Sequence, residues 1–262
     1  MSRESAVRIV VVHPELLGTY GDSGNGRVLA TRLRWRRIPS ELIMAPADRP
    51  LPQSGDIYCL GGGEDGPQVS SAAALNVDGS LVKAVDRGAA VLAVCAGFQI
   101  IGKSFPGPDG REVPGVGLVD AVTRRGRGPR AVGEVVSRPV PGLRLVPLSG
   151  YENHAGVTRL GPEASPLGMV HRGVGNGGGD GTEGAWQDKV LCTYLHGPVL
   201  ARNAALADHL LSSVVGPLGL LDDAEMEELR RERIRNGISG PATGRAWARH
   251  VWRRPSEVMT RF

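Results

Sequence analysis

Residues 89–99 constrain the fold of this chain more than any other segment. They read Ala-Ala-Val-Leu-Ala-Val-Cys-Ala-Gly-Phe-Gln, so an apolar run leads directly into Cys95 and then into Ala96 and Gly97. A short continuous apolar run is typical of a strand buried on both faces of a parallel sheet, and small residues allow a sharp turn into a helix. The sequence therefore predicts a strand over 90–94, Cys95 at the turn and a helix over 96–102.

Cys95 lies where an α/β-hydrolase carries its nucleophilic serine. At such a turn the side chain stands above the strand end, and the free N–H groups of the helix favour the reactive thiolate. Free cysteine is also among the most buried residue types, so a packed cysteine in a parallel strand is the alternative. The choice depends on which other residues reach the same sheet edge.

His196 is one such residue. Residues 190–198 form a second apolar run that ends at His196 and is followed by Gly197 and Pro198. If both runs are strands of one parallel sheet, Cys95 and His196 emerge at the edge where open α/β sheets place their sites. An imidazole within hydrogen-bond reach accepts the thiol proton and later protonates the leaving group. A lone histidine at a strand end is more often structural, but paired with Cys95 it is predicted to be catalytic.

A third apolar run, residues 57–60, precedes the glycine triplet 61–63. Consecutive glycines leave backbone N–H groups open to close approach, as an oxyanion hole requires. A flexible turn is the alternative interpretation. The position of the triplet directly after a strand favours a place in the site.

Together these segments resemble one family, the class I, or triad, glutamine amidotransferases of the CobB/CobQ-like branch. Within that branch they are most similar to the GatD group, the glutaminase subunits of lipid II isoglutaminyl synthases. The resemblance extends from about residue 7 to 215 and is specific only when its blocks are taken together. These blocks are the glycine triplet and residues 14–25, 94–99, 151–156 and 194–198.

The resemblance implies a catalytic role for two of these residues. Cys95 would attack the carboxamide of glutamine, form a thioester and release ammonia. His196 would act as general base and then as general acid. The backbone N–H groups of Gly62 and Ala96 would form the oxyanion hole.

The resemblance also implies the residues that bind glutamine. Arg130 best matches an arginine that holds the substrate, and a guanidinium suits a carboxylate because it pairs with it in bidentate fashion. Neighbouring arginines at 124, 125 and 127 are alternatives, and a solvated basic loop is the bland interpretation of each. Gln99, Asn153 and His154 are further predicted substrate-binding residues, although His154 could equally be a hydrogen-bonded loop residue.

One position departs from the family pattern. Most class I amidotransferases carry a glutamate two residues after the histidine, whereas this chain has Pro198. The resemblance implies that an aspartate of a partner subunit completes the triad, so we expect low glutaminase activity from the isolated chain and more with the partner. Asp22 and Asn25 are interpreted as helix-capping residues or as contacts to the site or to the partner.

Amide synthesis from a carboxylate requires ATP, yet the chain contains no phosphate-binding loop motif. The one Gly-x-Gly-x-x-Gly match, at 173–178, lies in a glycine-rich run that we interpret as a hairpin or mobile loop. We therefore expect no cofactor and no metal in this chain. The expected partner is a MurT-like subunit of the Mur ligase family, which would bind ATP and Mg²⁺ in a heterodimer and amidate the D-glutamate of the lipid II stem peptide.

Two other functions compete with a glutaminase subunit. The first is a stand-alone cysteine hydrolase of γ-glutamyl or related amides, which partner dependence would discriminate. The second is a catalytically idle scaffold, which is hard to reconcile with Cys95 and His196 both being present. The identity of the ammonia acceptor is not encoded here, because acceptor recognition would lie on the partner.

Composition limits the compartment and the partners. The chain has three cysteines, which is a small and odd number and does not fit a disulfide framework. We therefore expect a protein of the reducing cytoplasm. No stretch approaches 18 consecutive apolar residues, so we expect no membrane span. A net charge of +4 and an aromatic content of 4% argue against a nucleic-acid platform.

The pattern of elements predicts an α/β fold. We expect a three-layer, flavodoxin-like sandwich with a mainly parallel sheet and a short antiparallel extension. Expected strands lie at 7–12, 42–44, 57–60 and 90–94, with shorter ones near 116–122, 131–137 and 145–150; expected helices run from 22 or 23 to about 37, over 71–87, 96–102 and 201–215. We predict an amidotransferase-like domain over 1–221. Residues 222–262 would follow as a charged helix to about 235 and a tail that is flexible or docks on the partner through Trp247 and Trp252.

Overall fold

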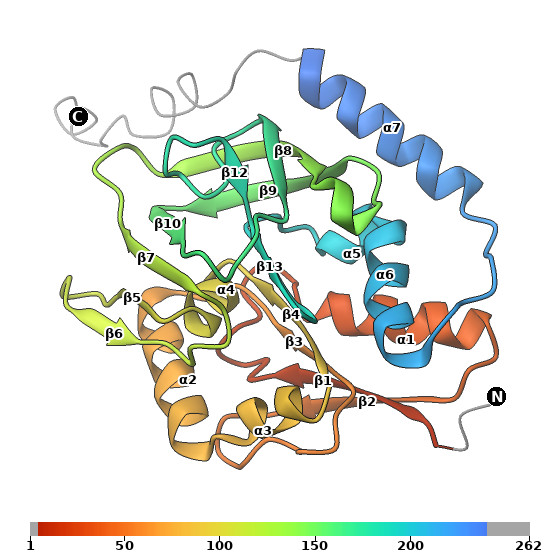
Figure 1. Cartoon of the computed structure of the whole chain (residues 1–262), viewed down its shortest axis with the longest axis horizontal. Coiled ribbons are helices and arrows are strands. Elements are labelled where there is room, and N and C mark those ends of the chain that lie inside the picture. The colour runs from red at the N-terminus through yellow and green to blue at the C-terminus, as the bar shows by residue number, and fades with distance from the viewer. Residues whose placement is uncertain (1–4, 240–262) are drawn as a thin grey trace, which may run out of the picture.

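Continuous apolar segments form the centre of a six-stranded sheet in the computed structural model, which describes residues 5–239 (Figure 1). Every neighbouring pair in the order β14-β4-β3-β1-β2 is parallel, whereas β13 joins β14 in the antiparallel sense. From β13 to β2 along the sheet, the strands span Ala185–Gln187, Val190–Thr193, Ala90–Val94, Ile57–Leu60, Val7–Val12 and Ser40–Ala45. All residues of β14, β4 and β3 are buried, which explains why apolar runs rather than alternating patterns encode them.

Helices cover both faces of this sheet (Figure 1). On one face α1 (Gly24–Trp35) packs against β1 and β2 and against α5 (Val199–Arg202) and α6 (Ala204–Val215). On the other face α4 (Ala96–Ile101) contacts β3 and β4 and packs against α2 (Asp65–Asp78). The predicted three-layer α/β fold with a mainly parallel sheet is therefore confirmed.

Two helices that the sequence predicts as continuous are interrupted. The helix predicted over 71–87 begins at Asp65 and consists of α2 and α3 (Ser80–Asp86). Gly79 separates them because its φ of 62° lies in the left-handed region, which glycine adopts without a steric penalty. The helix predicted over 201–215 is likewise divided, into α5 and α6. The prediction of single helices at these two places is wrong.

The extension beside the central sheet is larger than predicted. It comprises two four-stranded sheets of order β10-β7-β5-β6 and β12-β11-β8-β9, in which every neighbouring pair is antiparallel except β5 with β7. The strand predicted near 116–122 begins later, at Ala121, and Asn153 and His154 lie within β9 rather than after it. In chain order, β5 to β12 span Ser104–Pro106, Glu112–Pro114, Ala121–Arg125, Ala131–Pro139, Leu148–His154, Gly156–Leu160, Gly168–Arg172 and Thr182–Glu183, and a 3₁₀ turn spans Pro141–Leu143.

The charged C-terminal helix is present as α7 (Ala224–Ser239) and contacts β8 and β9. Arg32 on α1 holds the start of this segment, because its buried guanidinium binds the carboxylates of Asp208 and Asp223 at 2.6–2.9 Å. The predicted tail with its two tryptophans lies outside the described residues. Within residues 5–239 the structure contains no helix long and apolar enough to cross a membrane.

The strand register brings four loops to one edge of the sheet. Thr193 at the end of β14 pairs with Val94 at the end of β4, and Leu60 at the end of β3 pairs with Ala93. The sheet order changes direction between β1 and β3, which is where open α/β folds place their ligands. The segments that follow β1, β3, β4 and β14 therefore meet at this carboxyl edge.

Candidate active site

Cys95 occupies a strained turn between β4 and α4. Its φ of 54° and ψ of −103° are rare for a residue with a side chain, as expected at a nucleophile elbow. Gly97 makes the turn possible, because a Cβ there would lie 2.8 Å from the Cβ of Leu60. The Cys95 side chain is buried but reaches a cavity at the carboxyl edge. The predicted strand, turn and helix start are confirmed.

His196 and Asp22 form a buried hydrogen bond beside this turn. The Nδ1 atom of His196 lies 2.8 Å from Oδ2 of Asp22, and both side chains are inaccessible to solvent. Because a carboxylate oxygen only accepts, Nδ1 carries the proton. The Nε2 atom is buried and makes no hydrogen bond within the described part of the chain. This leaves Nε2 as the atom that can exchange a proton with the nucleophile or the substrate.

Several groups determine the charge on His196. Burial alone lowers its pKa, but the hydrogen bond that it donates to Asp22 and the proximity of Cys95 outweigh burial and raise the pKa to about 9. The ring of Tyr20 also packs against the imidazole, with centroids 4.4 Å apart. An imidazolium is therefore the form at neutral pH, and it has a proton to give to a leaving group.

Asp22 bears on one expectation drawn from the sequence. The sequence assigned the carboxylate beside the imidazole to a partner subunit and left Asp22 open between a helix cap and a site contact; in the structure Asp22, in the loop between β1 and α1, supplies a carboxylate to His196. Asp22 does not cap α1, since Ser23 occupies that position and makes no side-chain cap bond. Asn25 has a separate structural role, as its Oδ1 accepts the N–H of Leu200. The block 14–25 was the only sequence signal for this contact.

The glycine triplet lies beside the site, but one of its backbone N–H groups binds Asp22. The N–H of Gly62 donates to Oδ2 of Asp22 at 2.9 Å, so it is already committed to that carboxylate. A Cβ on Gly62 would lie 2.7 Å from Cε1 of His196, which explains why only glycine fits. Gly63 and Ala96 line the cavity. The N–H of Gly62 is therefore engaged by Asp22 in this structure, and the oxyanion roles of Gly62 and Ala96 stay predictions.

The cavity in front of Cys95 collects the predicted substrate-binding residues. Arg130, Gln99, Asn153 and His154 all line it. Of the alternative arginines, Arg125 also lines it and lies 3.8 Å from the carboxylate of Asp65. The remaining lining residues are Tyr20, Gly63, Asp65, Gln68, Cys95, Ala96, Pro106, Ala155 and Gly156.

Arg130 is held in place by Asn153. Its Nε donates to Oδ1 of Asn153, and its Nη2 donates to the carbonyl oxygen of the same residue at 3.1 Å. The Nδ2 of Asn153 in turn donates to the hydroxyl of Tyr20 at 2.8 Å. Asn153 thus connects the guanidinium of Arg130 to Tyr20, whose ring packs on His196.

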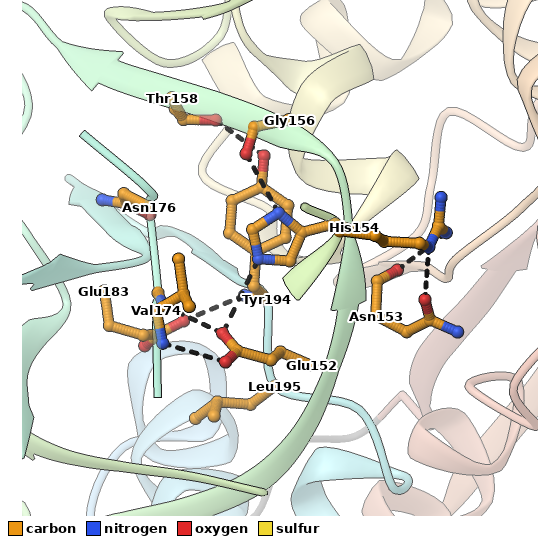
Figure 2. A network of polar contacts seen from close by, with 12 residues as sticks. Glu152, Asn153, His154, Gly156, Thr158, Val174, Asn176, Glu183, Tyr194 and Leu195 are labelled. Atoms are coloured by element: carbon orange, nitrogen blue, oxygen red, sulfur yellow. Dashed lines mark hydrogen bonds and ion pairs between the residues drawn. The ribbon is translucent and has the colours of Figure 1, made fainter. Parts of the chain in front are cut away.

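Gln99 and His154 also line the cavity, and both of them contact Tyr194. The ring of His154 stacks on that of Tyr194, with centroids 3.8 Å apart and planes at 18° (Figure 2). The Tyr194 hydroxyl lies 3.3 Å from Nε2 of Gln99, whose Oε1 accepts from Gln68 at 2.9 Å. Among the described residues no group of three or more His, Cys, Asp or Glu is placed to hold a metal ion.

Comparisons with known proteins identify the family of this chain. The sequence model of the CobB/CobQ-like glutamine amidotransferase domain matches residues 8–204. The chain is 32% identical over 206 residues to the lipid II isoglutaminyl synthase (glutamine-hydrolyzing) subunit GatD of Staphylococcus aureus, covering 78% of this chain and 82% of that protein. It is 30% identical to the subunit of the same name from Streptococcus pneumoniae, covering 80% of each. A crystal structure of a glutamine amidotransferase superimposes with a TM-score of 0.54 at 21% identity, over 79% of this chain and 98% of that one, which shows a shared fold.

Proposed function

This chain belongs to the CobB/CobQ-like glutamine amidotransferase family, and from this premise we propose that it hydrolyses L-glutamine to glutamate and ammonia at Cys95. The observation that carries the proposal is the convergence of Cys95, which lines the cavity, with His196 and Asp22 behind it. They come from three separate loops at the carboxyl edge of the sheet. A nucleophile, a base and a group that orients the base are the parts that nucleophilic catalysis requires.

The first half of the reaction forms a thioester. The thiolate of Cys95 attacks the carboxamide carbon, and backbone N–H groups of Ala96 and the glycine triplet stabilise the negative charge that develops on the oxygen. The C–N bond then breaks as Nε2 of His196 gives its proton to the departing nitrogen, which leaves as ammonia. The γ-glutamyl group remains on the sulfur.

The second half regenerates the enzyme. A water molecule attacks the thioester carbon while the now neutral Nε2 of His196 accepts its proton. The C–S bond breaks, glutamate leaves, and the thiolate and imidazolium are restored. Asp22 holds Nδ1 throughout, so that the same ring edge serves both steps.

We assign the glutamine backbone to the side of the cavity that carries Arg130. Its guanidinium would pair with the α-carboxylate, and the bonds from Asn153 hold it in one orientation. Gln99 and His154, which also line the cavity, would contact the remainder of the substrate. This assignment explains why polar side chains line a small cavity that ends at a thiol.

We further propose that the ammonia is delivered to an ATP-dependent MurT-like partner that amidates the D-glutamate of the lipid II stem peptide. The support is the similarity to two proteins that are themselves subunits of a lipid II isoglutaminyl synthase. ATP and Mg²⁺ would bind to that partner. Because the three described cysteines are free and Cys95 must stay reduced to act, we place the protein in the cytoplasm.

A second candidate is a stand-alone cysteine hydrolase of γ-glutamyl amides. The observation that favours it is Asp22, because a triad completed within the chain needs no partner residue. The two candidates differ in whether a Mur-ligase-like partner increases glutamine turnover, and in whether γ-glutamyl amides are better substrates than glutamine.

The test is glutamate release from glutamine by the purified chain, alone and with its Mur-ligase-like partner. Cys95→Ala is expected to abolish release, whereas Cys192→Ala, which removes a buried thiol on the neighbouring strand, should retain it. Arg130→Lys should raise the KM for glutamine by about tenfold or more, because a lysine cannot form the bidentate pair. Release that persists in Cys95→Ala would refute the proposal.

A further inference from the structure

Glu152 is a buried carboxylate that the proposed reaction does not use. It lies on β9 directly before Asn153 and two residues before His154, both of which line the glutamine cavity. Its side chain is only 3% exposed. A buried charge costs free energy unless it is paired or hydrogen-bonded, so its partners indicate its role.

The loop between β11 and β12 supplies those partners (Figure 2). Oε1 of Glu152 accepts the N–H of Val174, and Oε2 accepts the N–H of Gly175, each at 2.9 Å. Gly173 and Gly175 have φ angles of 105° and 63°, so successive N–H groups turn towards one anion, as in backbone nests. A Cβ on Gly173 would lie 2.8 Å from Cγ2 of Val135 and 3.0 Å from Oε1 of Glu152. This part of the loop is therefore shaped around the carboxylate.

Asn176, the next residue of the loop between β11 and β12, is fully buried and joins the two ends of this loop. Its side chain donates to Oγ1 of Thr182 at 3.0 Å and to the carbonyl oxygen of Gly184 at 2.9 Å. Its backbone carbonyl accepts the N–H of Thr158 on β10 at 2.8 Å. The glycine-rich segment is thus the loop of a hairpin formed by β11 and β12, and a hairpin is one of the two forms expected from the sequence.

His154 connects Glu152 to the cavity. Its Nδ1 lies 3.0 Å from the carbonyl oxygen of Gly156, which only accepts, so Nδ1 carries a proton. Its Nε2 lies 3.7 Å from Oε2 of Glu152 and makes no hydrogen bond within the described residues. The imidazole ring stacks on Tyr194, whose hydroxyl reaches Gln99 on the cavity wall. A continuous set of contacts therefore runs from the loop to two residues that line the cavity.

We propose that Glu152 is a positioning residue for glutamine binding. It holds the loop backbone at Val174 and Gly175 on one side and faces His154 on the other, and so it fixes the cavity wall. The inference rests on the proposed function, because it assumes that this cavity binds glutamine. Its carboxylate hydrogen-bonds to the loop and not to Cys95, so its loss affects substrate affinity more than the chemical step.

The experiment compares steady-state glutaminase kinetics of the full chain and four variants, using whichever form, alone or with partner, shows wild-type turnover. Glu152→Gln keeps one acceptor but places an NH₂ group against the second N–H. Gly173→Ala would place a Cβ against Oε1 of Glu152 and Cγ2 of Val135, and so displaces the same loop segment from its own side. The matched controls are Glu134→Gln, an exposed acid on β8, and Gly179→Ala, whose φ is also positive at 78° but whose Cβ would meet no atom within 4 Å.

Glu152→Gln and Gly173→Ala are each expected to raise the KM for glutamine by about tenfold, with a much smaller change in kcat, because small displacements of a binding wall weaken substrate positioning. Both controls should behave as the wild type. Protection of Cys95 from iodoacetamide by glutamine, read by intact mass, gives the same ranking without turnover.

An unchanged KM in both variants, or a kcat loss without a KM change, would overturn the inference. An equal effect of Gly179→Ala would also overturn it, because it would show general backbone strain. Failure of the proposed function is a separate result. In that case the wild type itself shows neither turnover nor protection by glutamine.

Discussion

Replacing Asp22 by asparagine tests the part of the site that the sequence placed on a partner. Asp22 is fully buried, and one of its oxygens accepts both the N–H of Gly62 and Nδ1–H of His196. An asparagine oxygen can occupy the same place and accept both bonds. Its NH₂ group then takes the position of Oδ1, which is buried without a hydrogen bond in the described part of the chain.

Two effects follow from this geometry. A hydrogen bond to a charged group contributes about 1.5–3 kcal/mol, so losing the charge of Asp22 should lower kcat/KM by about 10- to 150-fold. The unsatisfied NH₂ group should also lower the free energy of unfolding by about 1–3 kcal/mol. Because the bond to Asp22 raises the pKa of His196, the variant should further lose activity at a lower pH than the wild type.

The assay is glutamate release as a function of pH, with urea unfolding measured on the same samples. Asp48→Asn removes an exposed carboxylate, 72% accessible, and is expected to change neither quantity. If Asp22→Asn retains full kcat/KM and an unshifted basic limb, Asp22 does not orient His196. The carboxylate would then have to come from a partner, as the sequence first suggested.

Three further predictions follow from the site and its support. Gly62→Ala should abolish most activity because the new Cβ would lie 2.7 Å from His196, whereas Gly66→Ala, with no atom within 4 Å, should be silent in the same assay. Wild-type kcat/KM should be retained at neutral pH and fall as the pH rises through about 9, where His196 loses the proton that ammonia departure needs; a constant rate to higher pH would contradict this. Arg32→Met should lower the unfolding free energy by about 3 kcal/mol, since it removes the buried cation of Asp223 and leaves Asp208 with Arg36 alone, and Arg34→Met on the exposed side of α1 should not.

The central sheet and the meeting of Cys95 with His196 were predictable from the sequence. Both residues end continuous apolar runs, and parallel strands deliver their carboxyl ends to the same edge whatever the loops between them do. The same local signals gave the elbow, because a turn from a strand into a helix at Cys95 requires small residues such as Ala96 and Gly97.

Contacts between distant loops were not predictable in this way. Asp22 meets His196 across 174 positions of sequence, and no local pattern distinguishes such a contact from a helix cap. The commitment of the Gly62 N–H to the same carboxylate follows only from that contact. Glu152 likewise anchors a loop 22 positions later, which composition alone suggested was a hairpin or mobile. The substrate roles of Arg130, Gln99, Asn153 and His154 remain predictions; the structure shows that all four line one cavity.

The central claim is that Cys95 forms a covalent γ-glutamyl thioester. The most direct test mixes the protein with glutamine, quenches in acid within the first turnover and locates the adduct by peptide mass spectrometry. The account predicts one glutamyl group on the peptide that contains Cys95, absent from Cys95→Ala and removed on longer incubation as glutamate appears. Glutamate release without any adduct at Cys95, or an adduct on another residue, would contradict it.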